Sequence, residues 1–178
     1  MNFMSKLAPL ERLINQFSEW TGRVFSWLFV AMVVVQIGIV IFRYVFGLGN
    51  PLANDSVLYM HAISFMTLAG YTLRHDAHVR VDIFFLSAAE RVKGLIDLGG
   101  VILFMWPMCA VMFWSAWPYV TSSWAVREGS FRVSGIQGAY VLKTFILVFA
   151  VVLALQGLAM AISALNRIAK LRPLADQR

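Results

Sequence analysis

Four long apolar stretches dominate this sequence and limit the folds it can adopt. Residues 24–42, 56–73 and 98–126 contain no charged side chain, and residues 140–165 contain only Lys143. At about 1.5 Å per residue, a helix of this length crosses most or all of a bilayer core about 30 Å thick. We therefore expect an all-α integral membrane protein with four transmembrane helices.

The composition excludes an ordinary water-soluble domain. Of the 178 residues, 60% are hydrophobic and 13% are charged, and the mean hydropathy is +0.74. This leaves too little polar surface to cover a soluble domain. The net charge is +6, but the basic residues lie between the apolar stretches, so we expect phospholipid headgroups and no nucleic acid as their partners. The single cysteine, Cys109, excludes a disulfide within the chain.

Two shorter segments have the pattern of amphipathic helices at the membrane surface. Residues 1–23 would place apolar and polar side chains on opposite sides of a helix. Within residues 84–96, Ser87 and Glu90 have the spacing of a capping box, which predicts a second surface helix. In the first helix the apolar side comprises Leu10, Leu13, Ile14, Phe17 and Trp20, and the polar side comprises Glu11, Arg12, Asn15, Gln16 and Glu19.

The membrane domain is predicted at residues 24–165, followed by a basic tail at 166–178. The third apolar stretch is longer than a bilayer requires, so we expect tilt or a bend near Pro107 and Pro118. The spans are expected at about 24–42, 56–73, 98–124 and 140–165. Aromatic and basic side chains near span ends are typical of the headgroup level. The expected interfacial anchors are Trp20, Arg91, Lys93, Trp114, Trp117 and Trp124.

The distribution of basic residues predicts the orientation of the chain. Most of the 15 Lys and Arg residues lie in the N-terminal segment, the second loop and the C-terminal tail. Those in or beside the other two loops, 43–55 and 127–139, are Arg43, Arg127, Arg132 and Lys143. The positive-inside rule therefore places both termini and the second loop in the cytoplasm, with the other two loops facing outward.

The spans contain few residues with transporter or enzyme chemistry. None has an Asp or Glu, although ion-coupled carriers usually need an ionisable group at depth to bind the coupling ion. This argues against a self-sufficient transporter. His61 is the only titratable residue well inside a span; it could face a partner or a proton path, but we favour a neutral histidine bonded to a backbone carbonyl or a neighbouring helix. A haem carrier would need a second axial histidine at membrane depth.

A metal site is the other chemistry to consider. His75, His78 and Asp82 have a spacing that could place all three on one helical face. The segment lies at a helix end in a loop rich in arginine, where cationic neighbours oppose a metal ion. We therefore favour hydrogen bonds and an ion pair among His78, Arg80 and Asp82, and expect no metal and no cofactor.

Two roles are open for the acid that opens the second span. Asn54, Asp55 and Ser56 are good helix-capping residues, and the charge of Asp55 suits the positive end of the helix dipole. Alternatively, Asp55 faces outward and is available to a soluble partner. The same alternative applies to four more charged residues, Arg43, Arg127, Glu128 and Arg132.

Proteins of other classes fit the sequence less well. We see no nucleophile with a base, metal cluster or nucleotide-binding loop, which argues against an enzyme. A small homo-oligomeric channel or exporter would need a polar stripe along one span. The polar residues in the spans are scattered, and interhelical hydrogen bonds explain most of them. They are Gln36, His61, Ser64, Thr67 and Gln156.

A series of short motifs resembles one family of membrane proteins. In chain order it contains Arg43, Tyr44, Val45, Phe46, Pro51, Asp55, Gly70, His78, Val79, Arg80, Val81 and Asp82. Their order and spacing resemble the small membrane (Q-type) subunit of tripartite ATP-independent periplasmic (TRAP) transporters. The last hairpin, with Tyr140, Lys143, Gln156 and Gly157, extends the resemblance. The family usually has a tryptophan and paired acids before the second span, whereas residues 52–55 here supply a single acid.

The resemblance implies a protein without chemistry of its own. In such transporters a periplasmic substrate-binding protein delivers a carboxylate to a membrane complex, whose large subunit carries it with sodium in an elevator motion. The small subunit would be a scaffold, or stator, in the bacterial inner membrane. It would pack against the large subunit and help to dock the binding protein through the outward charged residues.

Overall fold

The computed structural model describes residues 3–75, 88–130 and 134–170. Within them the chain forms α1 (Phe3–Phe46), α2 (Pro51–Arg74), α4 (Glu90–Gly100), a π-helical turn η1 (Val101–Met105), α5 (Trp106–Ala125) and α6 (Ala139–Lys170). α4, η1 and α5 follow one another without a break, so the bundle has four long helices. The prediction of an all-α fold is confirmed.

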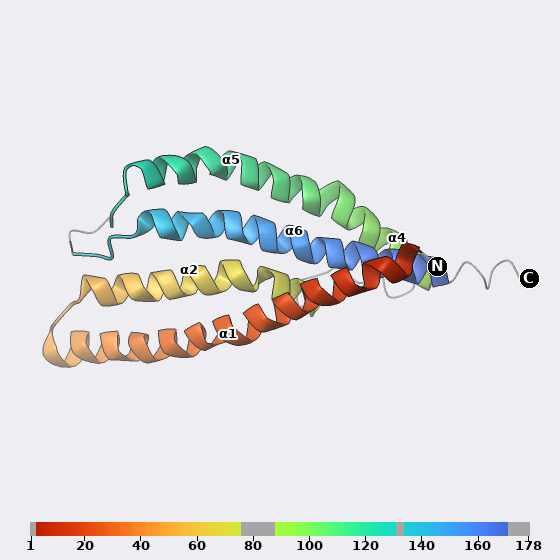
Figure 1. Ribbon diagram of the computed structural model, residues 1–178. Coiled ribbons are helices and arrows are strands. Elements are labelled where there is room, and N and C mark those ends of the chain that lie inside the picture. The colour runs from red at the N-terminus through yellow and green to blue at the C-terminus, as the bar shows by residue number, and fades with distance from the viewer. Residues whose placement is uncertain (1–2, 76–87, 131–133, 171–178) are drawn as a thin grey trace, which may run out of the picture.

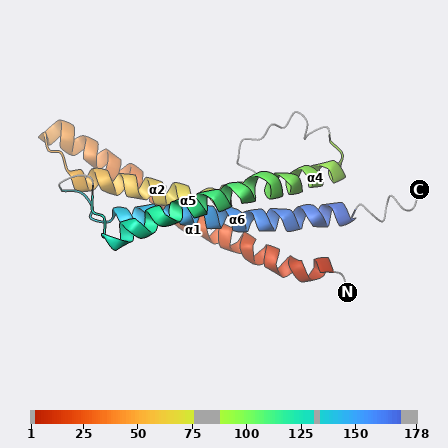
Figure 2. The same ribbon diagram turned by 90° about the horizontal axis from the view of Figure 1, so that it is seen from above.

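The four helices run side by side, with α6 in the centre of the bundle (Figure 1). α6 contacts α1, α2, α4 and α5, and α1 also packs along α2. The start of α1 and the end of α6 lie at one end of the bundle, which we call the terminal end (Figure 2). We call the opposite end, which carries the connections 47–50 and 126–138, the loop end.

Three helices have the length and composition of membrane spans. They are Leu7–Phe46, Glu90–Ala125 and Ala139–Ala169. α2 is 24 residues long and is not among them. Between Asp55 and Arg74 it carries His61 and several hydroxyl residues, which lower its mean hydropathy. The chain is therefore a membrane protein with three helices of span composition and a fourth long helix packed between two of them.

The predicted N-terminal surface helix is not a separate element. α1 continues from Phe3 to Phe46 and joins the amphipathic segment to the first apolar stretch. Gly22 does not interrupt the helix, and it is the position where the Tyr71 ring of α2 packs against the α1 backbone. On the apolar side of the segment Leu13 is 64% and Trp20 59% exposed, whereas Ile14 is buried.

The predicted surface helix at 84–96 also differs from the structure. Its described part is α4, which begins at Glu90 and leads directly into the third apolar stretch. The N-cap position is Ala89, without a side-chain cap, and Ser87 lies outside the described residues. α4 packs on α6 at Gly94, where an added Cβ would lie 2.9 Å from Ile168 Cγ1. This packing holds α4 in the bundle as the start of a long helix.

A π-helical turn marks the site where we predicted a bend. Trp106 N donates to Val101 O, five residues back, immediately before Pro107. Proline has no N–H and crowds the preceding turn, so a wider turn relieves the clash and reassigns the hydrogen bonds. The second proline, Pro118, lies inside α5, which continues through it.

α2 begins earlier than predicted. Asn50 is its N-cap, and the Asn50 side chain accepts from Leu52 N at 3.0 Å and from Ala53 N at 3.4 Å. Pro51 then takes the first helical position, where its missing N–H costs nothing. The prediction that Asn54, Asp55 and Ser56 cap this helix is therefore wrong, and the Asp55 carboxylate accepts hydrogen bonds from the 126–138 connection instead.

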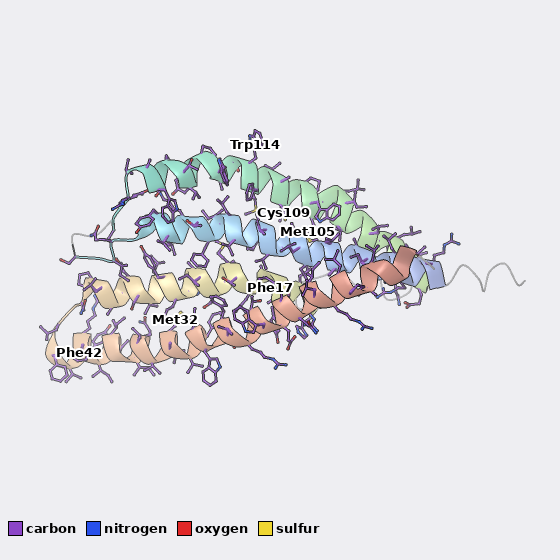
Figure 3. All side chains as sticks on the ribbon, viewed as in Figure 1. Phe17, Met32, Phe42, Met105, Cys109 and Trp114 are labelled. Atoms are coloured by element: carbon purple, nitrogen blue, oxygen red, sulfur yellow. The ribbon has the colours of Figure 1, made fainter. Side chains whose placement is uncertain are left out.

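Small side chains form the core where the helices meet. Ala150, Ala159 and Ala164 of α6 are buried, as is Ala69 of α2. Small residues let helix backbones approach closely, which is how membrane helices gain packing energy. Cys109 faces α6 from α5, while Trp114 points away from the bundle and is 85% exposed (Figure 3).

Candidate functional site

Polar side chains of α1, α2 and α6 meet beside the last turn of α2, near the middle of α6, in what we call the polar seam. Its core is a chain of hydrogen bonds. Ser18 Oγ donates to Gln156 Oε1 at 2.6 Å, and Gln156 Nε2 donates to Asn15 Oδ1 at 3.0 Å. Ser18 is 1% exposed and Gln156 is 3% exposed. Asn15 and Ser18 are three residues apart on α1, so they share one side of the helix and both reach α6.

The second part of the polar seam links α1 to the end of α2. Glu19 Oε2 accepts from Arg74 Nη1 at 2.9 Å and lies 3.1 Å from His75 Nε2. Arg74 also donates to the backbone oxygen of Asn15. One carboxylate thus holds two residues at the end of α2. Of the polar side that we predicted for residues 1–23, Asn15 and Glu19 contact the neighbouring helices, whereas Arg12 and Gln16 are exposed.

A polar cavity of about 300 Å³ adjoins the seam. All four long helices contribute to its lining, which includes Glu11, Arg74, Asp97 and Arg167. Arg167 Nη1 lies 3.4 Å from Asp97 Oδ2, which ties α6 to α4. Two acids and two guanidinium groups thus line this cavity. Among the described residues no group of three metal-ligating side chains occurs.

Gln156→Leu is expected to destabilise the bundle by about 1–3 kcal/mol, because it leaves the buried Ser18 hydroxyl and the Asn15 amide without a partner. Gln36→Leu is the matched control, since Gln36 is exposed on α1. Unfolding of the purified chain in detergent micelles measures both. Equal unfolding midpoints for the two variants would show that the seam contributes little.

A second cluster of polar contacts organises the loop end. Asp55 is 6% exposed, and its Oδ2 accepts from Ser130 Oγ and from Ile136 N, both at 3.0 Å. Tyr59 adds a hydrogen bond from its hydroxyl to Ile136 O at 3.4 Å. Gly135 passes so close to Asp55 that a Cβ there would overlap the carboxylate. Asp55 therefore fixes the 126–138 connection to α2.

Glu128 anchors the other side of the same connection. It accepts from Ser123 Oγ at 2.6 Å and from Lys143 Nζ. The Lys143 ammonium also lies 4.0 Å from the centroid of the Tyr119 ring, in a cation–π contact. The hydrogen bond from Lys143, with a smaller contribution from Ser123, holds the pKa of the Glu128 carboxyl below its ordinary value.

The contact between Glu128 and Lys143 makes the stability of the folded chain depend on pH, and the direction of the Glu128 pKa shift gives the sign of that dependence. Folding lowers the pKa of the Glu128 carboxyl, so the ionised carboxylate stabilises the folded chain. This stabilisation is complete above the pKa of the unfolded chain, about 4.3, and is lost as the pH falls through the lower pKa of the folded chain. We expect Glu128→Gln to lower the unfolding midpoint at pH 7, and the difference from the native chain to shrink as the pH falls below about 4. A difference that persists unchanged at pH 3 would contradict this assignment.

The structure places the predicted docking residues in different environments. Arg43 and Arg127 are exposed at the loop end, and Arg127, which follows the C-cap of α5, has a φ of 45°. Asp55 is buried and Glu128 is bonded to Lys143. Arg132 lies outside the described residues. Of the four predicted docking residues that the structure describes, Arg43 and Arg127 are thus the exposed ones.

The remaining predicted residues belong either to the family motif or to the interfacial anchors. Of the family motif, Tyr44 and Phe46 are exposed and Gly70 is buried against Val152, while His78, Arg80 and Asp82 lie outside the described residues. Every predicted aromatic anchor is at least half exposed, and Arg91 is exposed. Lys93 is bonded to Glu90 at 3.0 Å. The aromatic anchors and their exposed fractions are Trp20 59%, Trp114 85%, Trp117 52% and Trp124 50%.

The polar residues predicted to form interhelical hydrogen bonds behave differently from one another. Gln156 forms such bonds. Ser64 Oγ and Thr67 Oγ1 are buried without a hydrogen-bond partner among the described residues. Gln36 and His61 are exposed. Sequence reasoning did not connect Ser18 and Asn15 to Gln156, although their helical spacing on the polar side of residues 1–23 was a usable signal.

Comparison with known proteins decides the family. Residues 31–171 match the family described as tripartite ATP-independent periplasmic transporters, DctQ component. The chain belongs to the DctQ family. This confirms the predicted resemblance, and because DctQ proteins are transporter subunits, it also confirms that the chain is not an enzyme. Comparison with curated proteins and with solved structures gives no match in either set.

The DctQ match covers the loop-end cluster completely and the polar seam in part. Asp55, Glu128 and Lys143 fall inside it, as does Gln156. The seam residues of α1, which include Ser18 and Glu19, precede the matched region. This DctQ chain is therefore a membrane subunit of a tripartite transporter. Its own polar side chains largely bond to one another.

Proposed function

We propose that this DctQ chain is the fixed scaffold subunit of its transporter. It would support a larger membrane subunit that carries a carboxylate together with sodium, after a periplasmic binding protein has delivered the substrate. One observation carries the proposal: each described carboxylate is bonded to another group of the chain itself. These carboxylates are Glu11, Glu19, Asp55, Glu90, Asp97 and Glu128.

The positions of the carboxylates support the same proposal. The sequence has no Asp or Glu between Glu19 and Asp55, or between Asp97 and Glu128. The central parts of the helices therefore lack the ionisable group with which membrane carriers usually bind a driving ion. Coupling ion and substrate are expected to bind to the larger subunit, and this chain to hold that subunit in place.

The proposed orientation places the terminal end in the cytoplasm of a bacterium and the loop end in the periplasm. The start of α1 and the end of α6 lie at the same end of the bundle, as an even number of crossings requires (Figure 1). Most Lys and Arg residues belong to the segments at that end, which the positive-inside rule assigns to the cytoplasm. The chain would then lie in the inner membrane.

The loop end is the proposed docking surface for the binding protein. Arg43 and Arg127 are exposed there and would meet acidic groups of the soluble partner. Asp55 and Glu128 would act indirectly, by fixing the 126–138 connection that presents Arg127. Arg43→Glu with Arg127→Glu should therefore reduce uptake while the membrane complex still assembles.

Reconstitution into liposomes tests the scaffold function. Three preparations are compared, each with the binding protein and its carboxylate: this chain alone, the large subunit alone, and both together. The proposal predicts sodium-driven uptake only when both are present. Uptake by this chain alone, or full uptake by the large subunit alone, would refute it.

A further inference from the structure

One titratable side chain lies on the outside of the bundle, in the middle of a helix. His61 belongs to α2, at about 15 Å from Pro51 and about 20 Å from Arg74 along the axis. It is exposed, and no described residue is hydrogen-bonded to its ring. Its nearest ring contact is Phe65, one turn away on the same helix, at 6.2 Å between centroids. Among the described residues, therefore, neither a backbone carbonyl nor a neighbouring helix bonds to His61.

The surroundings of His61 are apolar. Leu58 and Phe65, three residues before it and four residues after it, share its side of α2 and are 54% and 62% exposed. Even a neutral imidazole has one N–H donor and one acceptor nitrogen. Leaving such groups without partners in a hydrocarbon environment is costly, which is why ionisable residues at membrane depth usually face protein or water.

Lipid and water-soluble partners do not satisfy His61. Acyl chains offer no hydrogen-bonding group. The imidazole is too short to reach the headgroups from the middle of the helix, unlike lysine or arginine near a helix end. A soluble protein does not enter the membrane to this depth. What remains is a membrane-embedded protein with a polar group opposite His61.

We infer that a transmembrane helix of the large transporter subunit covers the α2 face formed by Leu58, His61 and Phe65, and that a polar side chain or a free backbone carbonyl of that helix bonds to the His61 ring. The identity of the partner rests on the proposed function. The surface and its polar contact follow from the position of His61. Leu58 and Phe65 would pack around the hydrogen bond and exclude other polar groups.

Photo-cross-linking tests which molecule covers this face. A benzophenone amino acid replaces Phe65, so that an aromatic group substitutes for an aromatic group one turn from His61. In membranes that contain the complete transporter, we expect the cross-linked product to contain the large subunit. A product with a second copy of this chain, or with lipid alone, would overturn the inference.

Two substitutions test the polar contact. His61→Leu should reduce co-purification of the large subunit by about three- to twentyfold, the range expected for one interhelical hydrogen bond. His61→Gln, which keeps a donor and an acceptor, should retain most of it. The unfolding midpoint of the isolated chain should stay the same in both variants. Co-purification of His61→Leu at the native level would refute the contact.

The outcome also separates the two proposals. If the native chain does not co-purify with the large subunit, the proposed scaffold function fails and the inference fails with it. If the native chain co-purifies but position 65 cross-links only to lipid, the scaffold function stands and only this assignment of the surface is wrong.

Discussion

Gly70→Leu is expected to prevent α2 from packing against α6. A Cβ on Gly70 would lie 2.6 Å from Val152 Cγ1, 3.4 Å from Val152 O and 3.5 Å from Ser18 Oγ. α1, α2 and α6 therefore meet at this glycine, and a leucine would force at least two of them apart. Overpacking typically costs about 1–3 kcal/mol, and we expect at least the upper end here because backbone is involved. Unfolding of the purified chain, followed by circular dichroism, measures the loss.

Two further variants isolate the cause of this effect. Gly38→Leu is the control, because no atom lies within 4 Å of a Cβ built on Gly38. It should leave the unfolding midpoint nearly unchanged. Gly70→Ala should destabilise less than Gly70→Leu, and adding Val152→Ala should restore part of the loss by removing the nearest methyl group. A native midpoint for Gly70→Leu would show that the helices do not meet as described.

Asp55→Ala is expected to release the 126–138 connection at the loop end. The substitution removes the acceptor for Ser130 Oγ and for the Ile136 amide, both of which would be left without that partner. An unsatisfied buried group costs about 1–3 kcal/mol, and more when the lost partner is charged. Faster hydrogen exchange of the Ile136 amide and faster proteolysis of the connection would report the release.

Asp55→Asn distinguishes this structural role from a direct charged contact with the binding protein. Asparagine keeps an acceptor oxygen but loses the charge, so the structural role predicts a smaller loss of stability and uptake than in Asp55→Ala. A direct charged contact predicts an equal loss of uptake in both variants. Asn54→Ala is the neighbouring control, because Asn54 Nδ2 donates only to Asn50 O near the start of α2.

Hydropathy predicted the number and order of the long helices because apolar length is a strong constraint in a membrane. Helix ends were less predictable, since charged residues do not mark them. Glu19 and Arg23 lie inside α1, where Glu19 bonds to α2. The start of α2 depends on Asn50 and Pro51, a short capping signal that precedes the apolar stretch by several residues.

The candidate site was harder to predict than the fold. α2 buries the hydroxyl residues Ser64 and Thr67 and exposes Leu58 and Phe65, the reverse of a soluble helix. Membrane helices pack through small and weakly polar side chains, so hydrophobicity does not identify the inner face. For the same reason His61 could not be assigned to the inside or the outside without the positions of the neighbouring helices.

Measurements of membrane depth test the central claim, that this subunit stays fixed while its partner moves. Spin labels are placed at two exposed positions, Val33→Cys on α1 and Ser115→Cys on α5, with the native Cys109 replaced by alanine. The depth of each label in the bilayer, measured from its accessibility to oxygen and to a polar relaxation reagent, is compared in the complete transporter with and without binding protein, substrate and sodium. The scaffold account predicts the same depth for each label in every state. A shift of about 5 Å, one helical turn, would contradict it.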